Sequence, residues 1–461
     1  MSTTTSAHAS HEPFADAAAH TGASDALLAE AARHGADAEV WTAWHETDEL
    51  VCRDGAVERR SEVLSGATAL TVWADGNEGY AVRNAPGATD TALVTTALAV
   101  GRVLAAGDTA PAPHTDRAPR TEPPAPLPRI GADATARLRA LTESADDGDV
   151  EIELRARADR TRVRLHRAGT DPAEYDTGVA QLFARITARG SGTGYIGHQI
   201  FGRTMDGVLD AAERTELGEL VGLARILTTR PATALDHDDV LVDGRVLCRL
   251  LTLVAPAFLL DSVLEGRSPL KDGIGERVAS SGVTLVDDPT ADDAPLPAPW
   301  DGEGTPTGPT VLVEDGVLRG FLSSRRTAAE AGAPATGSAQ RGANGEMTTV
   351  QPGHLVLSHT EDLGTETRPG RTVLHIVQAN GAHTSNPITG DFSIGANAVL
   401  VSPDGTRRNA GNITLAGNVF NLLRSIDGHD GRVRVNRSNN SFVAGPGVWT
   451  RSLTVGHQEG A

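Results

Sequence analysis

The sequence contains few of the residues that cross-link small secreted proteins or build metal knuckles. Among its 461 residues there are only two cysteines, Cys52 and Cys248, and they lie far apart in the chain. This spacing excludes a disulfide framework and a CxxC metal site. We therefore expect a reducing, cytoplasmic environment for this chain.

Positive charge is also scarce. Lysine occurs once, at Lys271, and 41 Lys and Arg residues stand against 60 Asp and Glu, which gives a formal net charge of −19. Sequence-independent binding of nucleic acid needs a cationic face that displaces counterions from the phosphates. We therefore expect no nucleic acid partner.

A membrane-spanning run is missing from the sequence pattern. The longest apolar run, residues 247–264, is interrupted by Arg249, Pro256 and Asp261, whereas a spanning helix needs about 20 apolar residues. The first twenty-odd residues lack the basic start and apolar centre of a signal peptide. We expect no membrane contact and interpret residues 247–264 as a buried helix.

Aromatic residues make up only 3% of the chain, while glycine occupies 50 positions. Much glycine with short alternating apolar runs is typical of turn-rich β structure. We predict an α+β fold, in which an N-terminal α/β region of helices and antiparallel strands precedes a C-terminal antiparallel β-barrel-like domain. The predicted segments are a disordered tail (1–22), an N-terminal α+β unit (23–108), a Pro-rich linker (109–130), a central α+β unit (131–232) and a β-rich C-terminal domain (233–461).

The familiar catalytic and metal-binding motifs are missing as well. The sequence has no HExxH, no GxSxG and no P-loop, which are the patterns of zinc peptidases, serine hydrolases and nucleotide-binding proteins. His354 and His359 flank an expected strand, but their odd separation directs them to opposite faces. We therefore predict no metal site within this chain.

Paired carboxylates are present at residues 287–295 and 300–306. Two carboxylates can act as general acid and base when their environments separate their pKa values. Asp288, Asp301 and Glu303 are the candidates for such a role. The alternative is that these acids cap turns and lie in a solvated loop.

The stretch GAHTSNPITGDFSIGAN, residues 381–397, combines an Asn-Pro turn, a Thr-Gly-Asp sequence and several glycines. Glycine allows positive φ or the close approach of another chain, and Asp can accept hydrogen bonds from local amides. From the residues alone, both a functional wall and a structural turn remain open. The candidate site residues are His383, Asn386, Thr389, Gly390 and Asp391.

The order of four blocks resembles the TldD/PmbA family, and most closely its PmbA branch, also called TldE. The blocks are EGRSPLKDGIGERVASSGVTLVDDP, WDGEGTPTGPTVLVEDGVLRGFL, GAHTSNPITGDFSIGAN and NITLAGNVFNLLRSI, which together cover much of the C-terminal half. The N-terminal region, with GNEGYAV, agrees more loosely. The resemblance implies a subunit that pairs as a heterodimer with a TldD-like metalloprotease.

In TldD-like chains an HExxxH helix precedes the first of these blocks, and a further cysteine ligand lies near the C-terminus. Here the helix is RVLCRLLTLVAPAFLLDSVL, which has no histidine, and the final segment NNSFVAGPGVWTRSLTVGH has no cysteine. This chain therefore resembles the non-metal subunit. The resemblance implies that this chain binds no cofactor and that zinc lies on the TldD-like partner.

The resemblance further implies proteolysis of peptides or peptide-derived metabolites, including tailoring steps in natural-product biosynthesis. In that case residues 381–397 shape a substrate cleft beside a metal held by another chain, with His383 donating to a substrate carbonyl. Two alternatives remain open. One is a non-catalytic regulatory protein, as in the older family label of DNA gyrase modulator, and the other is a stand-alone carboxylate-dependent hydrolase.

Overall fold

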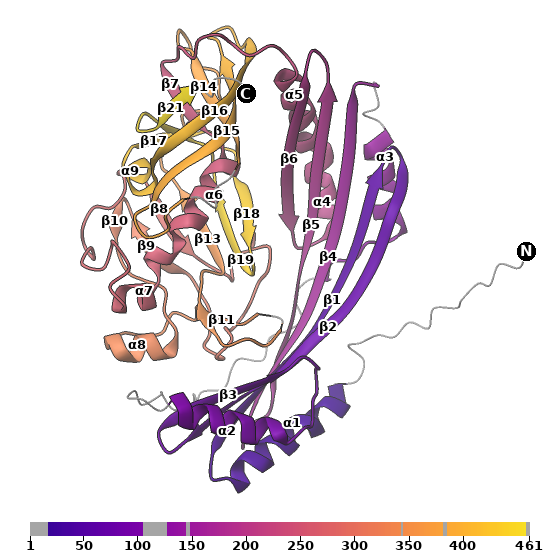
Figure 1. Ribbon diagram of the computed structural model, residues 1–461, viewed down its shortest axis with the longest axis vertical. Helices are drawn as coiled ribbons and strands as arrows, with labels where there is room; N and C mark the ends of the chain where they lie inside the picture. Colours follow the sequence, from indigo (N-terminus) through magenta and orange to yellow (C-terminus); the bar gives the residue numbers. More distant parts are fainter. Residues whose placement is uncertain (1–16, 105–126, 144–147, 343, 381–384, 458–461) are drawn as a thin grey trace, which may run out of the picture.

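The computed structural model describes residues 17–104, 127–143, 148–342, 344–380 and 385–457 (Figure 1). The helices are α1 (Ala17–Arg33), α2 (Ala92–Leu104), α3 (Ala132–Glu143), α4 (Met205–Ala211), η1 (Ala212–Glu216), α5 (Leu217–Leu227), α6 (Gly244–Val254), η2 (Ala255–Phe258), α7 (Leu260–Leu264), α8 (Arg325–Ala331) and α9 (Val419–Arg424). The strands are β1 (Asp37–Arg53), β2 (Ala56–Ala74), β3 (Asn77–Arg83), β4 (Val150–Arg167), β5 (Ala173–Arg189), β6 (Thr193–Gly202), β7 (Asp239–Val242), β8 (Thr284–Asp287), β9 (Thr310–Glu314), β10 (Val317–Leu318), β11 (Ala339–Gln340), β12 (Thr349–Val350), β13 (His354–Ser358), β14 (Val373–Asn380), β15 (Asp391–Val401), β16 (Arg407–Asn418), β17 (Ile426–His429), β18 (Arg434–Ser438), β19 (Ser441–Gly445), β20 (Val448–Thr450) and β21 (Thr454–His457).

A long antiparallel sheet with the strand order β3-β2-β1-β4-β5-β6 forms the N-terminal half (Figure 1). Two Asp-Gly turns connect its first three strands, and Asp54, Gly55, Asp75 and Gly76 all have positive φ. Two successive positive-φ residues give a hairpin turn whose twist matches that of the strands. Because β1 pairs with both β2 and β4, the two α+β units predicted as separate segments share one sheet.

Helices cover this sheet in two groups. Leu27 of α1 and Val94 of α2 pack with Leu70 of β2 in one core cluster. The helices α3, α4, η1 and α5 form a second cluster with β4, β5 and β6, which contains Leu138 and Leu220. The helix α1 begins at Ala17, so the tail predicted for 1–22 overlaps a helix, because its alanine-rich end favours helix before Ser24. Residues 1–16 and most of the predicted linker lie outside the described residues.

Two further sheets build the C-terminal half, with the orders β17-β20-β7-β14-β15-β16-β21 and β10-β9-β8-β13-β19-β18. The helix α6 lies between them and contacts β14, β18 and β19. Most strand pairs are antiparallel, but β7 with β14 and β13 with β19 are parallel. The predicted α+β class is confirmed. None of the helices in the described ranges is long and apolar enough to cross a membrane.

The two halves contact each other through α5 and the middle of the N-terminal sheet. The helix α5 packs against β15 and β16 of the C-terminal half, and Leu241, Val377 and Trp449 join the same core cluster as Leu220. A buried group of charged side chains crosses this contact, in which Arg434 of β18 meets Glu219 of α5 at 3.0 Å. The relative placement of the halves therefore rests on both apolar and ionic contacts.

Candidate functional site

The structure describes residues 385–397 of the predicted stretch 381–397. These residues begin with a tight turn that leads into β15. Asn386 Oδ1 accepts hydrogen bonds from the backbone N–H groups two and three residues ahead, at 2.9 and 3.2 Å. The Thr389 hydroxyl donates to Asp391 Oδ2 at 2.7 Å. The structure thus brings these three predicted residues together in one turn, while His383 lies outside the described residues.

Asn418 fixes this turn to α9. Its Nδ2 donates to the Thr389 carbonyl and to Asp391 Oδ1, at 2.7 and 2.8 Å, and its Oδ1 caps the N-terminus of α9. The hydrogen bonds from Asn418 and Thr389 lower the pKa of Asp391. Gly390 has a φ of +79°, and a Cβ there would come within 2.7 Å of the Phe420 ring, so this position requires glycine. That the turn meets a substrate stays a prediction.

The helix α6 stands where the family resemblance places the HExxxH helix. Its residues that are not fully buried are Arg245, Arg249, Thr252 and Leu253, and none of these side chains is an ordinary zinc ligand. Cys248 is fully buried, its thiol donates to a β18 carbonyl at 3.3 Å, and burial raises its pKa. A metal binds the thiolate, so α6 does not fit a zinc ion. Within the described ranges, no group of three His, Cys, Asp or Glu side chains is placed to hold a metal.

The exposed side of α6 contacts the end of β14. Arg249 Nη1 donates to the carbonyl of Ala379 at 3.2 Å, and Ala379 is close to the end of β14. The helix α6 also contacts α9, to which Asn418 fixes the turn at 385–391. That the stretch forms a wall beside α6 stays a prediction.

The three carboxylates proposed for a stand-alone hydrolase accept hydrogen bonds from neighbouring groups of the chain. Asp288 Oδ1 accepts from Thr290, and Glu303 Oε2 accepts from the backbone N–H at the start of α8. Asp301 is buried and accepts from two N–H groups of its own loop and one of β11. Burial, with the neighbouring charge of Glu303, raises the pKa of Asp301 to about 7. Asp288 therefore fits the turn-capping alternative, whereas the buried Asp301 does not lie in a solvated loop.

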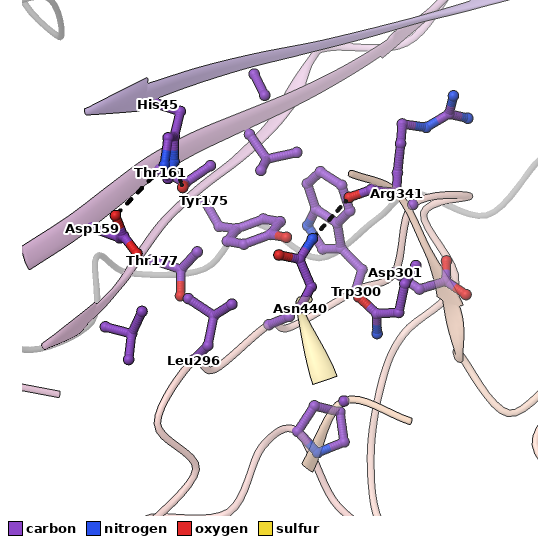
Figure 2. A pocket seen from close by; sticks show the side chains of 18 of the residues that line it. His45, Asp159, Thr161, Tyr175, Thr177, Leu296, Trp300, Asp301, Arg341 and Asn440 are labelled. Carbon is purple, nitrogen blue, oxygen red and sulfur yellow. Dashed lines mark hydrogen bonds and ion pairs between the residues drawn. The ribbon is translucent and has the colours of Figure 1, made fainter. Parts of the chain in front are cut away.

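A partly enclosed cavity lies where the N-terminal sheet faces the C-terminal half (Figure 2). Its volume is about 80 Å³, enough for several water molecules. The labelled lining residues are His45 of β1, Asp159 and Thr161 of β4, Tyr175 and Thr177 of β5, Leu296, Trp300 and Asp301 of the loop between β8 and β9, Arg341, and Asn440. The cavity therefore exists only because the two halves meet.

Polar groups on the sheet side of this cavity form a closed set of hydrogen bonds. The Thr47 hydroxyl donates to Asp159 at 2.7 Å and lies 3.1 Å from His45 Nε2. His45 Nδ1 lies 2.8 Å from the Thr161 hydroxyl, as Figure 2 shows. Burial lowers the pKa of His45 despite the nearby carboxylate of Asp159. This histidine is therefore neutral at pH 7, with its Nε2 assigned as the donor to Thr47.

Aromatic side chains line the cavity from both the sheet and the facing loop. The rings of Tyr175 and Trp300 meet edge to face, with centroids 4.6 Å apart, and Trp41 also lines the cavity. Sequence reasoning missed these residues. The sequence holds only 5 Trp and 3 Tyr. Three of them line one cavity, and this grouping can be seen only in the folded chain because the residues lie far apart in the sequence.

A wider groove of about 590 Å³ lies at the other end of the contact between the two halves, near the end of α5 and the strands β15 and β16. Among its described lining residues only Arg230 is charged, and the others are mostly small or amide side chains. It has neither aromatic walls around an enclosed space nor a cluster of ionisable groups. We therefore assign it no chemistry.

Comparisons with known proteins agree with this architecture. Residues 236–457 match the family described as PmbA/TldA metallopeptidase C-terminal domain. A metalloprotease of Methanothermobacter thermautotrophicus is 26% identical over 417 residues, which cover 85% of this chain and 87% of that protein. The C-terminal part of the chain, residues 236–457, therefore belongs to the PmbA/TldA metallopeptidase family.

Other relatives match shorter parts of the chain. An uncharacterised protein of Methanocaldococcus jannaschii is 37% identical over 157 residues, which cover 34% of this chain and 37% of that protein. The match to a metalloprotease of Archaeoglobus fulgidus, 32% identical over 169 residues, spans 36% of this chain and 39% of that relative's length. The chain therefore spans well under two thirds of the length of these two relatives.

Solved structures show the same fold over nearly the whole chain. TldE from Thermococcus kodakarensis superimposes with a TM-score of 0.76 at 18% identity and covers 94% of this chain and 100% of that one. A Thermotoga maritima protein described as a proposed modulator of a DNA gyrase gives a TM-score of 0.77 at 20% identity, with coverage of 94% and 99%. At these identities the likeness concerns the fold alone.

Proposed function

We propose that this chain is a PmbA/TldE-like subunit of a heterodimeric TldD/TldE-type metalloprotease. It acts on peptides or peptide-derived metabolites, and the zinc ion is bound by the TldD-like partner. The observation that carries the proposal is the composition of α6. The helix has the place of the family's metal helix, but its accessible side chains are Arg245, Arg249, Thr252 and Leu253.

In this proposal the chain forms part of the wall of the substrate cleft and supplies no metal ligand. Asn418 ties the turn at 385–391 to α9 through a hydrogen bond, and Gly390 is required at its position. A peptidase gains from enclosing its metal in a space that excludes folded proteins and holds an extended peptide. The partner's metal and this wall together form that space.

The test is reconstitution with an HExxxH-bearing relative encoded near this chain. The isolated chain, the isolated partner and the co-expressed pair are compared for zinc content and for hydrolysis of an unstructured peptide. We expect turnover only from the pair, loss of turnover with a chelator, and zinc that co-purifies with the partner. A partner whose motif glutamate is replaced by glutamine is the matched inactive control.

Stoichiometric zinc on the isolated chain would contradict the proposal. Chelator-resistant turnover by the isolated chain would favour the carboxylate hydrolase instead, and Asp301→Asn would then remove it. Tight binding of DNA gyrase without any effect on peptide turnover would favour the regulatory alternative.

A further inference from the structure

A buried donor without an acceptor lies at the cavity of Figure 2. The side chain of Trp300 is fully buried, and its indole N–H has no acceptor among the described residues. Buried N–H groups in native proteins almost always have a hydrogen-bond partner, and leaving one unpaired is costly. Trp300 lines the cavity, so the contents of the cavity can supply the missing acceptor.

Tyr175 brings a second donor to the same cavity. Its ring meets that of Trp300 edge to face, with centroids 4.6 Å apart, and Figure 2 shows its hydroxyl end directed toward Trp300. Within the described ranges, no hydrogen bond contributes to the raised pKa of this hydroxyl. The strand β5 and the loop between β8 and β9 therefore each place a donor without an acceptor at this cavity.

Asn440 adds an acceptor to the lining. Its Nδ2 donates to the carbonyl of Arg341 at 3.4 Å (Figure 2), which assigns its Oδ1 to the side that faces away from that carbonyl. Two donors and one acceptor complement a carboxamide group, whose oxygen accepts two hydrogen bonds and whose nitrogen donates.

The remaining lining suits carbon better than water. A buried water molecule makes about three hydrogen bonds, and apolar walls offer none. Besides the two aromatic rings already named, the apolar side chains of the lining include Trp41, Val163, Leu296 and Ala298. An organic group with one polar end therefore matches the cavity better than water alone.

A neutral group fits this lining better than a charged one. Asp301 also lines the cavity, and its charge raises the pKa of the Tyr175 hydroxyl, so a carboxylate bound there would lie near a second carboxyl group. Arg437 already pairs with Asp159 at 3.1 Å. Burying a further charge is costly, and a carboxamide avoids that cost.

The volume limits the size of the bound group. A dry cavity of roughly 150 Å³ holds one benzene molecule. In proportion, the present volume of about 80 Å³ holds roughly three or four non-hydrogen atoms, which are those of a carboxamide and the carbon attached to it. Because the cavity is only partly enclosed, the rest of a longer ligand can extend into solvent.

We propose that this cavity is a binding subsite for a neutral carboxamide group, whose oxygen accepts from Trp300 Nε1 and the Tyr175 hydroxyl and whose nitrogen donates to Asn440 Oδ1. The group belongs either to a small free amide or to an Asn or Gln side chain of a peptide. The subsite does not rest on the metalloprotease proposal, because it needs neither a partner nor zinc.

The test observes the indole N–H groups directly. The full-length chain is prepared with isotope-labelled tryptophan, and the Trp300 signal in the NMR spectrum is assigned by its loss in Trp300→Phe. We expect acetamide to shift this signal saturably, with a dissociation constant in the millimolar range, because so small a ligand makes few contacts. Trp449 is the internal reference, since its N–H already donates to the carbonyl of Gly364 at 3.2 Å.

Ligand pairs of equal shape separate neutral from charged groups. Acetate matches acetamide in shape but carries a charge at neutral pH, and we expect it to bind at least about tenfold more weakly. The tripeptides Gly-Asn-Gly and Gly-Asp-Gly repeat this comparison on a peptide. Binding of acetamide alone would support the subsite and assign it to free amides, while binding of Gly-Asn-Gly as well would extend it to peptide side chains.

Variants connect the binding to the named groups. We expect Tyr175→Phe and Asn440→Ala each to weaken acetamide binding roughly three- to tenfold, because each removes one hydrogen bond. Tyr195→Phe is the matched control, since Tyr195 is 42% exposed and lies in the wider groove. This control is expected to bind acetamide like the wild type.

The proposal is overturned if acetamide produces no saturable shift of the Trp300 signal, or if Trp449 shifts in parallel. It is also overturned if acetate binds as tightly as acetamide, or if Tyr175→Phe and Asn440→Ala keep the wild-type affinity. These measurements use the lone chain and no catalysis, so failure of the subsite and failure of the metalloprotease proposal are seen separately.

Discussion

Two regions of the contact between the halves differ in the pKa shifts of their buried ionisable groups. In the interdomain ion network, defined by Glu216, Glu219, Asp243, Arg245 and Arg434, each charge has an opposite charge within salt-bridge distance. Burial alone would raise the pKa values of Glu219 and Asp243, but the neighbouring arginines lower both. Glu219 and Asp243 are therefore ionised when the protein is folded, whereas burial raises the pKa of Glu216 despite Arg434 and Arg245.

The cavity of Figure 2 shows the opposite behaviour. Burial raises the pKa of Asp301 to about 7 and raises that of Tyr175, and it lowers the pKa of His45. These three groups are driven toward their neutral forms. Asp159 in the same lining is the exception, because Arg157 and Arg437 pair with it and lower its pKa. The comparison indicates that a buried acid of this contact stays charged where arginines pair with it and is driven toward its neutral form where none does.

The largest expected effect comes from breaking the ion network. Arg434→Leu leaves Glu216 with no guanidinium at hydrogen-bond distance and removes one of the three arginine partners of Glu219. Removal of one member of a buried ion pair costs about 3–5 kcal/mol. We expect the free energy of unfolding, measured by urea denaturation, to fall by this amount.

The matched control is Arg319→Leu. Arg319 pairs with Glu314 at 3.1 Å, but the two side chains are 49% and 61% exposed, and such surface pairs contribute about 0–1 kcal/mol. Equal losses in the two variants would show that the ion network does not hold the halves together.

A change of comparable size, spread over several pH units, is expected from the pH dependence of Asp301→Asn. The folded-state pKa of Asp301 is about 7, above the unfolded value of about 3.9. Between these values the folded state binds more protons, so this group lowers the free energy of unfolding as the pH rises, by at most about 1.4 kcal/mol per pH unit. We expect the difference in stability between wild type and Asp301→Asn to change with pH from about 4 to about 7.

Asp243→Asn is the contrasting variant, because asparagine retains the N-cap of α6. The folded-state pKa of Asp243 is lowered, so its stabilisation is present above the unfolded pKa and is lost as the pH falls below about 3.9. We expect this variant to be less stable at pH 7 and to lose little further stability in acid. A pH dependence shared by both variants would contradict the comparison.

The smallest effect is expected for Tyr175→Phe. Burial and the charge of Asp301 raise the pKa of Tyr175, and no hydrogen bond contributes. Removal of a hydroxyl that has no partner leaves no buried group unsatisfied, and the ring contact with Trp300 is kept. We expect the free energy of unfolding to change by less than about 1 kcal/mol. A loss of several kcal/mol in urea denaturation would show that the hydroxyl has a partner in solution.

Much of the fold follows from local pattern. The alternation in β1, β2 and β4 predicts strands, and the Asp-Gly pairs predict the positive-φ turns between the first three strands. The apolar run 247–264 was predicted as one buried helix, but the structure divides it into the end of α6, η2 and α7, because Pro256 cannot continue the α-helix. Asn386 with Thr389 predicts a turn, which the structure shows. These features depend on residues a few positions apart, so a single sequence contains them.

The cavity and the shared N-terminal sheet do not follow from local pattern. Arg341 donates to the hydroxyl of Tyr80 across 261 positions of sequence, and His45 lies 2.8 Å from Thr161 across 116 positions. The pairing of β1 with β4 also crosses the segment that we predicted as a linker. No periodicity encodes contacts between elements so far apart.

The sequence by itself determined the α+β class, the family resemblance, and the lack of the usual zinc ligands on α6. Those conclusions depend on which residue types follow one another. Only the tertiary structure decided that the two N-terminal units form one sheet, that the aromatic residues meet at the cavity, and that residues 56–66 of β2 pair with β1 alone among the strands of the described ranges. These outcomes depend on which surfaces come together when the chain buries its apolar side chains, because that burial is summed over the whole molecule.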